Sequence, residues 1–314
     1  MTTTTATSTG SDADKRIGMI VMCLAMGLLP VGDAISKSLT SVLPPFEVTV
    51  LRALAQAAFL VPVAVLLRRH LAGPIFTLAS LASAALIATV TYTLITAFSV
   101  MPIATAIAIF FLEPLVLTLL AGIFLGEVPG PRRFAAVGVG LVGAMIVIRP
   151  NFAVFGPVAL LPLVGAVAYA LNMIVLRKAS LRQSALSFQV GASLCAAALL
   201  GGAEIVRLAL GGGGGPLLEM PGWAMIAVAA AGMLATVTFL MITFAFSKVE
   251  ASILAPFQYL EIVGATAVGF LIFGEFPDGM TILGAAIILG SGIYVFHRER
   301  ARDLEVASAQ PRDH

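Results

Sequence analysis

The chain has 314 residues, of which 60% are hydrophobic and 11% are charged, and its formal net charge is +2. Soluble globular chains carry about 25% charged residues, so this composition excludes an ordinary soluble domain and indicates a membrane protein. A net charge this small gives no reason to expect a nucleic-acid partner.

Apolar segments of membrane-spanning length follow one another along the chain. A spanning helix needs about 20 mostly apolar residues, and in lipid it must satisfy its backbone hydrogen bonds internally. Proline, glycine and charge separate the segments, for example at 43–45, 149–151 and 274–279. We therefore predict an all-α integral membrane protein with ten transmembrane helices, at 17–38, 46–67, 75–97, 103–124, 132–149, 157–176, 185–208, 222–246, 251–273 and 279–296.

The placement of lysine and arginine predicts the orientation of these helices. If the N-terminus is cytoplasmic, 14 of the 18 basic residues fall on the inner side and three on the outer side, and Arg52 lies within the second span. The positive-inside rule therefore places both termini in the cytoplasm. Both termini can lie on the same side only if the number of spans is even, and the predicted number of ten meets this condition.

The sequence repeats itself at an offset of 148 residues. LE at 112–113 falls on LE at 260–261, and GE at 126–127 falls on GE at 274–275. This self-similarity predicts two five-helix repeats, and because five is odd the second repeat must be inverted relative to the first. We divide the chain into an N-terminal cytoplasmic tail, a first repeat, a second repeat and a C-terminal cytoplasmic tail, at 1–16, 17–150, 151–297 and 298–314.

The two patterns LEPLVLTLLAGIFLGE and LEIVGATAVGFLIFGE, each followed by a glycine-rich span, resemble the two halves of EamA-type transporters of the drug/metabolite transporter superfamily. The resemblance covers about residues 17 to 297. It implies a multi-pass protein of the bacterial inner membrane that exports small metabolites by alternating access. Aromatic or apolar amino acids are the expected substrates, and another metabolite or a drug is the alternative.

Two rival classes are a channel and an intramembrane enzyme. The sequence contains neither HExxH nor GxSxG, and no predicted span contains a histidine. We therefore expect no catalytic residues, no metal site and no cofactor. The expected partners are a small-molecule substrate and the lipid bilayer. We expect a monomer, because ten helices can enclose a cavity alone.

Two glutamates lie deep within predicted spans. Glu113 is about ten residues from either end of its span, roughly 15 Å deep, and Glu261 is placed similarly. A charge near the bilayer centre is unfavourable by about 2.5–3.5 kcal/mol even on the lenient insertion scale. Either the pair faces a cavity, where it binds a substrate amine or takes up a proton, or each carboxyl bonds a neighbouring helix. Glu127 and Glu275, at loop edges, are predicted to cap and pack helix ends.

Polar and aromatic residues on the same helical faces are further candidates for a cavity lining. Small-molecule pockets are mostly apolar with a few placed polar groups, although Ser and Thr also bond membrane helices together. The fourth and ninth spans contribute residues three positions from each glutamate, which stack on one face. The candidates beside the two glutamates are Tyr92, Thr96, Phe110, Tyr169, Asn172, Gln258 and Tyr259.

Charged residues near the outer ends of the first two spans are candidates for gating. Asp33 and Lys37 have i, i+4 spacing, and we expect them to pair with each other. Arg52 could snorkel to the surface, pair with Glu47, reach Glu113 or bind a substrate carboxylate. Glu204 and Arg207 are expected to reach the membrane interface. Proton coupling and uniport both remain open, as does the direction of net flux.

Overall fold

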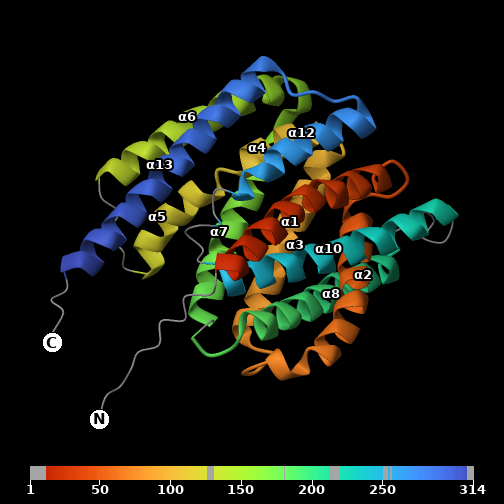
Figure 1. Ribbon diagram of the computed structural model, residues 1–314. Coiled ribbons are helices and arrows are strands. Elements are labelled where there is room, and N and C mark those ends of the chain that lie inside the picture. The colour runs from red at the N-terminus through yellow and green to blue at the C-terminus, as the bar shows by residue number, and fades with distance from the viewer. Residues whose placement is uncertain are drawn as a thin grey trace, which may run out of the picture.

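The computed structural model describes residues 12–125, 131–179, 181–211, 220–249, 254 and 257–309, and these residues contain helices and no strand (Figure 1). The helices are α1 (Asp12–Leu39), α2 (Pro45–Leu66), η1 (Arg68–His70), α3 (Leu78–Phe98), α4 (Ile103–Phe110), α5 (Glu113–Leu125), α6 (Pro131–Phe155), η2 (Gly156–Leu160), α7 (Leu161–Ala179), α8 (Ala185–Ala209), α10 (Gly222–Lys248), α12 (Leu260–Phe273) and α13 (Gly279–Ala309).

Most of these helices are long and apolar enough to cross a membrane. Within the described residues, seven stretches meet that condition: Asp14–Leu39, Pro45–Leu66, Leu78–Phe98, Ile103–Leu120, Asn151–Ala179, Ala185–Ala209 and Gly222–Lys248. Three shorter apolar helices, Ala135–Ile148, Leu260–Phe273 and Gly279–Tyr294, lie at the predicted fifth, ninth and tenth spans. The protein is therefore an all-helical, multi-pass membrane protein, as its composition predicts.

Several predicted breaks are confirmed, and local chemistry explains them. α2 begins at Pro45, where a missing N–H is harmless in the first turn. α12 ends at Phe273, and the next residue, Gly274, has a φ of 68° that allows a left-handed cap in which its N–H donates to the Phe270 carbonyl (3.0 Å). Asp278 then caps α13 by accepting a hydrogen bond from Thr281 N (2.7 Å).

Three helix ends differ from the prediction. α6 does not stop at 149 but continues to Phe155, and the buried Asn151 amide donates to the Val147 carbonyl (2.5 Å). α13 extends to Ala309, into the predicted C-terminal tail, because that segment is rich in Ala, Arg and Glu, which favour helix. α1 starts at Asp12, and acidic residues in a first turn are stabilised by the helix dipole.

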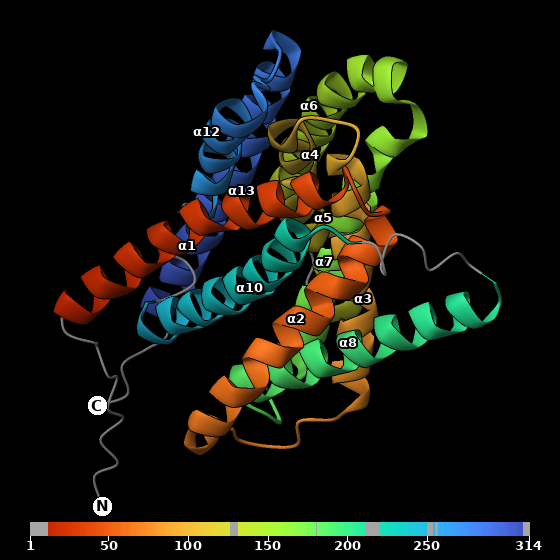
Figure 2. The same ribbon diagram turned by 90° about the vertical axis from the view of Figure 1, so that its right-hand side faces the viewer.

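Helices from the two halves of the chain pack on one another. α1 lies along α10, and α3 lies along α7 (Figures 1 and 2). α2 packs on both α8 and α10, while α3 packs on α8. α6 and α13 form a pair at the edge of the assembly opposite α2 and α8.

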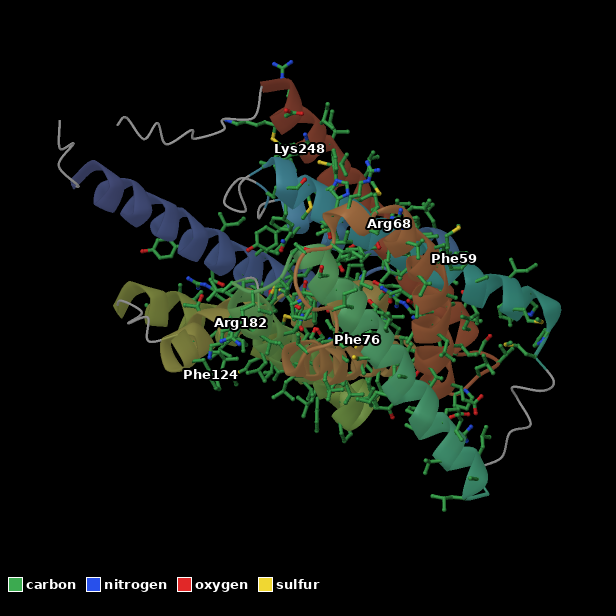
Figure 3. All side chains as sticks on the ribbon, turned by 90° about the horizontal axis from the view of Figure 1, so that it is seen from below. Phe59, Arg68, Phe76, Phe124, Arg182 and Lys248 are labelled. Carbon is green, nitrogen blue, oxygen red and sulfur yellow. The ribbon has the colours of Figure 1, made fainter. Side chains whose placement is uncertain are left out.

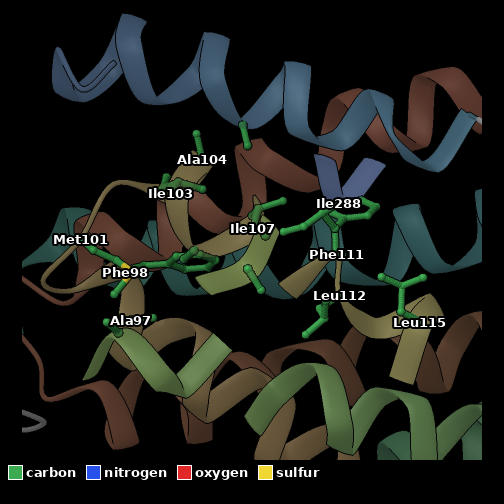
Figure 4. Close-up of a cluster of buried hydrophobic side chains, with 14 of the residues drawn as sticks. Ala97, Phe98, Met101, Ile103, Ala104, Ile107, Phe111, Leu112, Leu115 and Ile288 are labelled. Atoms are coloured by element: carbon green, nitrogen blue, oxygen red, sulfur yellow. The ribbon is translucent and has the colours of Figure 1, made fainter. Parts of the chain in front are cut away.

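The hydrophobic core is centred on α4 and the start of α5. Each residue from Ile103 to Ile109 is buried, as expected of a helix that is apolar all round. Phe98, Phe111 and Leu112 join this cluster, and Ile288 reaches it from α13 (Figure 4). The core therefore lies directly beside Glu113.

Some predicted features lie outside the described residues. They are Glu127 with the GE pattern at 126–127, most of the glycine run after α8, and the extreme ends of the two tails.

Candidate functional site

The predicted fourth span is interrupted immediately before its glutamate. α4 ends at Phe110, Phe111 and Leu112 form a turn, and α5 starts at Glu113. Pro114 explains the break, because its missing N–H removes the bond that the Phe110 carbonyl would otherwise accept. Glu113 is thereby placed in the first turn of a half-helix, where a carboxylate is favoured by the helix dipole.

The predicted ninth span has the same construction. Tyr259 is a turn residue, α12 starts at Leu260, and Glu261 lies in the first turn. Phe111 and Tyr259, the two turn residues, are separated by the repeat offset of 148, and their rings contact each other with centroids 5.6 Å apart. A third helix joins them, because Phe110 packs edge-on against Tyr169 of α7 at 5.7 Å.

The two glutamates share this aromatic environment. Glu113 and Glu261 both lie within electrostatic range of the Tyr169 hydroxyl. Glu113 also acts on Tyr259, and Glu261 interacts with Asp33 of α1. The predicted candidates Phe110, Glu113, Tyr169, Tyr259 and Glu261 therefore lie together. We call these five residues the central cluster.

The glutamates of the central cluster have no protein partner in the part of the chain that the structure describes. Both side chains are half-buried, and neither makes a hydrogen bond or an ion pair there. A buried or half-buried carboxylate without a partner is unfavourable unless something else supplies charge or hydrogen bonds. The arrangement can therefore bind a cationic or hydrogen-bonding group between aromatic rings.

The other predicted cavity candidates have different surroundings. Asn172 is buried and accepts a hydrogen bond from Ser83 of α3 (2.6 Å). Thr96 donates to the backbone carbonyl of Tyr92 (2.7 Å). Tyr92 is 41% exposed and packs against Phe46 of α2 at 6.1 Å. Gln258 is half-buried.

The predicted Asp33–Lys37 pair is wrong. Lys37 donates to both carboxylate oxygens of Glu275 (2.7 Å each) and to the Met101 carbonyl (2.9 Å), and it lies 5.0 Å from the ring centroid of Phe273. Glu275 was predicted to cap a helix end, and its side chain pairs with Lys37 instead. Spacing along one helix cannot reveal this pair, because 238 residues separate its members.

Arg52 pairs with Asp33 (3.6 Å) and donates to Ser36 (3.3 Å), so the interpretations that join it to Glu47 or Glu113 are wrong. Glu47 instead accepts from Arg207, which also binds Glu204 (2.7 Å each). The Glu204 side chain is buried in this network, and its position at the membrane interface stays a prediction.

A hollow of about 410 Å³ adjoins the Lys37 pair. Trp223 and Phe273 form its aromatic walls, and Ser38, Thr40, Ser41 and Ser99 line the rest. Lys37 borders this hollow from the side of α1. Among the described residues, no group of three or more His, Cys, Asp or Glu side chains is arranged to hold a metal ion.

The model of the EamA-like transporter family matches the chain twice, over residues 16–149 and 156–296. The chain belongs to this family. The predicted resemblance to this family is confirmed.

Two curated relatives of this EamA-like transporter carry substrate names. A riboflavin transporter of Rhizobium johnstonii is 31% identical over 207 residues, which is 66% of this chain and 66% of the relative. An S-adenosylmethionine uptake transporter of Rickettsia felis is 27% identical over 202 residues, covering 64% of this chain and 66% of the relative. Each match thus spans just under two thirds of the relative's length.

A solved crystal structure shares the fold of this EamA-like transporter, with a TM-score of 0.54 at 19% sequence identity. The superposition covers 93% of this chain and 99% of the other.

Proposed function

We propose that this EamA-like protein is a secondary transporter of the bacterial inner membrane that moves a small metabolite by alternating access between two inverted repeats. The observation that carries the proposal is the central cluster. It brings two carboxylates without protein partners, one from each half of the chain, to the same group of aromatic rings. A solute that supplies a positive or hydrogen-bonding group would complete this site.

The helix packing supports two related five-helix units and a total of ten spans. If α1 corresponds to α7 and α3 to α10, the packing of α1 on α10 matches that of α7 on α3. The pairs α2 on α10 and α8 on α3 correspond in the same way. Phe111 and Tyr259 are equivalent residues that contact each other, which requires them to lie close to the axis relating the units.

An odd number of helices in each unit makes the units inverted, and the positive-inside rule places both termini in the cytoplasm. Lys37 and Glu275 then lie on the outer side. Their ion pair joins α1 of the first unit to the segment after α12 of the second, and it borders the hollow of about 410 Å³. We propose that this pair holds the outer side closed, with the hollow as its external vestibule.

The substrate we favour is a metabolite with a flat aromatic ring system and a cationic or amide group. Aromatic rings of the central cluster can stack on or pack edge-on against such a ring system. Two relatives are named for riboflavin and for S-adenosylmethionine, so a metabolite other than an amino acid has better support than the amino acids expected from sequence. Export remains our prediction for the direction of flux, although one relative is named for uptake.

The test is transport by purified protein in liposomes. A panel of riboflavin, S-adenosylmethionine and aromatic amino acids, each labelled, is measured for uptake and efflux with and without a pH gradient. We expect saturable movement of at least one flat aromatic metabolite, competed by its analogues. Movement that does not saturate would indicate a channel, and the absence of movement for the whole panel would contradict this substrate class.

A further inference from the structure

Two short segments on one end of the protein are tied together. Ser184, which precedes α8, donates its N–H to the Ala72 carbonyl (2.8 Å), and its hydroxyl donates to the His70 carbonyl (3.2 Å). The Ala72 N–H donates back to the Ser184 hydroxyl (3.3 Å). Gly73 has φ of +81°, and a Cβ there would lie 2.5 Å from the Arg182 carbonyl oxygen. The segment after α2 therefore lies directly against the segment after α7.

This junction gathers positive charge. Arg68 and Arg69 of the first segment, and Lys178 and Arg182 beside the second, are all exposed, and we call these four residues the basic patch. None of the four makes an ion pair in the described part of the chain. The sequence between Glu47 and Glu113 contains no acidic residue, and neither does the sequence between Glu127 and Glu204. Figure 3 views this end of the protein and labels Arg68 and Arg182.

Large apolar side chains surround the basic patch at the same helix ends. Leu66, Leu78 and Leu181 are 81%, 83% and 85% exposed, and Phe76 is 67% exposed. These side chains would be unfavourably hydrated in water but fit the boundary between headgroups and acyl chains. A basic cluster with an apolar rim at the ends of membrane helices is complementary to an anionic lipid surface.

We infer that the basic patch binds the phosphates of anionic phospholipid headgroups at the cytoplasmic surface, and that the bound lipid holds the two tied segments together. The location rests on the orientation proposed above, whereas the chemistry does not depend on transport. A soluble anion would satisfy the four charges but would make no contact with the surrounding leucines. A phospholipid matches both features. Its phosphate lies at the level of the four charges, and its acyl chains lie at the level of the leucines.

Binding of phosphatidylglycerol to the full-length protein in detergent tests the inference, with phosphatidylcholine as the uncharged comparison. The two test variants are R68Q/R69Q and K178Q/R182Q. The matched control is K15Q/R16Q, which removes the same charge from the start of α1 on the same side. Native mass spectrometry counts the bound lipids, and the rise in melting temperature with added lipid gives the affinity.

Each basic residue near an anionic surface contributes about fivefold in affinity, so each test variant should bind phosphatidylglycerol about 25-fold more weakly. We expect the control to bind within about twofold of the parent protein, because Lys15 and Arg16 lie on α1, outside the site that the tied segments form. R68K/R69K keeps the charge and should retain binding, which separates loss of charge from misfolding. Equal weakening by the control, equal binding of phosphatidylcholine, or equal protection by inorganic phosphate would each overturn the inference.

Discussion

The carboxylates of this protein form two groups with opposite surroundings. One group lies in ion pairs that join different helices: Asp33, Glu47, Glu204 and Glu275. The other group, Glu113 and Glu261, lies among aromatic rings and has no partner in the described part of the chain. A carboxylate that already has a protein partner stabilises packing, whereas one without a partner is available to a solute.

Substitution of the unpaired glutamates should have the largest effect on transport and little effect on stability. Glu113→Gln and Glu261→Gln keep the shape of the side chain but remove its ionisable carboxyl group. Loss of a hydrogen bond to a charged group is worth about 1.5–3 kcal/mol, so initial transport rates should fall at least about tenfold. The melting temperature should stay constant or rise, because an uncompensated carboxylate has been removed.

Initial rates in liposomes and thermal unfolding in detergent would be measured on the same preparations. Glu204→Gln is the matched control, since it makes the same chemical change in a carboxylate that is paired with Arg207, away from the central cluster and the Lys37–Glu275 pair. If transport is unchanged in both variants of the central cluster, Glu113 and Glu261 serve packing. The two groups of carboxylates would then not differ in function.

Lys37→Met should have the next largest effect, and it should act on closure and stability. The substitution leaves the Glu275 carboxylate beside Phe273 with no cation, and its side chain is only 27% exposed. We expect the free energy of unfolding to fall by about 1–3 kcal/mol. A cysteine placed at Ser99, in the wall of the hollow, should react faster with an impermeant maleimide.

The exchanged pair K37E/E275K tests whether the attraction itself holds the outer side closed. It should recover part of the lost stability and slow the reaction at position 99. If the maleimide reacts equally fast in the parent protein and in Lys37→Met, the pair does not close the vestibule.

Arg52→Gln should have a smaller effect and should depend on Asp33. Asp33 interacts with Glu261, so loss of Arg52 leaves a further uncompensated carboxylate beside the central cluster. We expect a loss of about 1 kcal/mol in stability, because the two side chains are 3.6 Å apart and remain partly exposed. The double variant R52Q/D33N should unfold at a higher temperature than Arg52→Gln alone, and a strictly additive double variant would exclude the coupling.

The sequence predicted the features that arise from local patterns. Apolar runs and proline or glycine breaks predicted the helices, and the offset of 148 identified Glu113 and Glu261 as equivalent positions. Partners far apart in the chain were not predictable, since nothing in one helix indicates which distant charge will face it. Lys37 and Glu275 are the clearest case, and Arg207 with Glu47 is another.

The break before Glu113 shows the same limit within a single span. Pro114 was visible in the sequence, but the run at 103–124 was predicted as one span from its apolar length alone. At the position equivalent to Pro114 the second repeat has Ile262, so the break before Glu261 was not indicated by the same signal. Asn172 was considered for the cavity, and only the position of Ser83 on another helix reveals its partner.

Ser83→Ala should have the smallest effect. It tests whether the distinction between groups with and without a protein partner also holds for an uncharged group. The Ser83 hydroxyl donates to Asn172 between two buried positions, and such interhelical bonds are worth about 0.6 kcal/mol in membrane proteins. Thr89→Ala, on the same helix, is the matched control, because its hydroxyl bonds only the Ala85 carbonyl of that helix. A polar group that the protein already satisfies should leave transport unchanged when its bond is lost. A marked fall in transport at unchanged stability would instead mean that Asn172 reaches the solute, and the distinction between satisfied and available groups would then fail for amides.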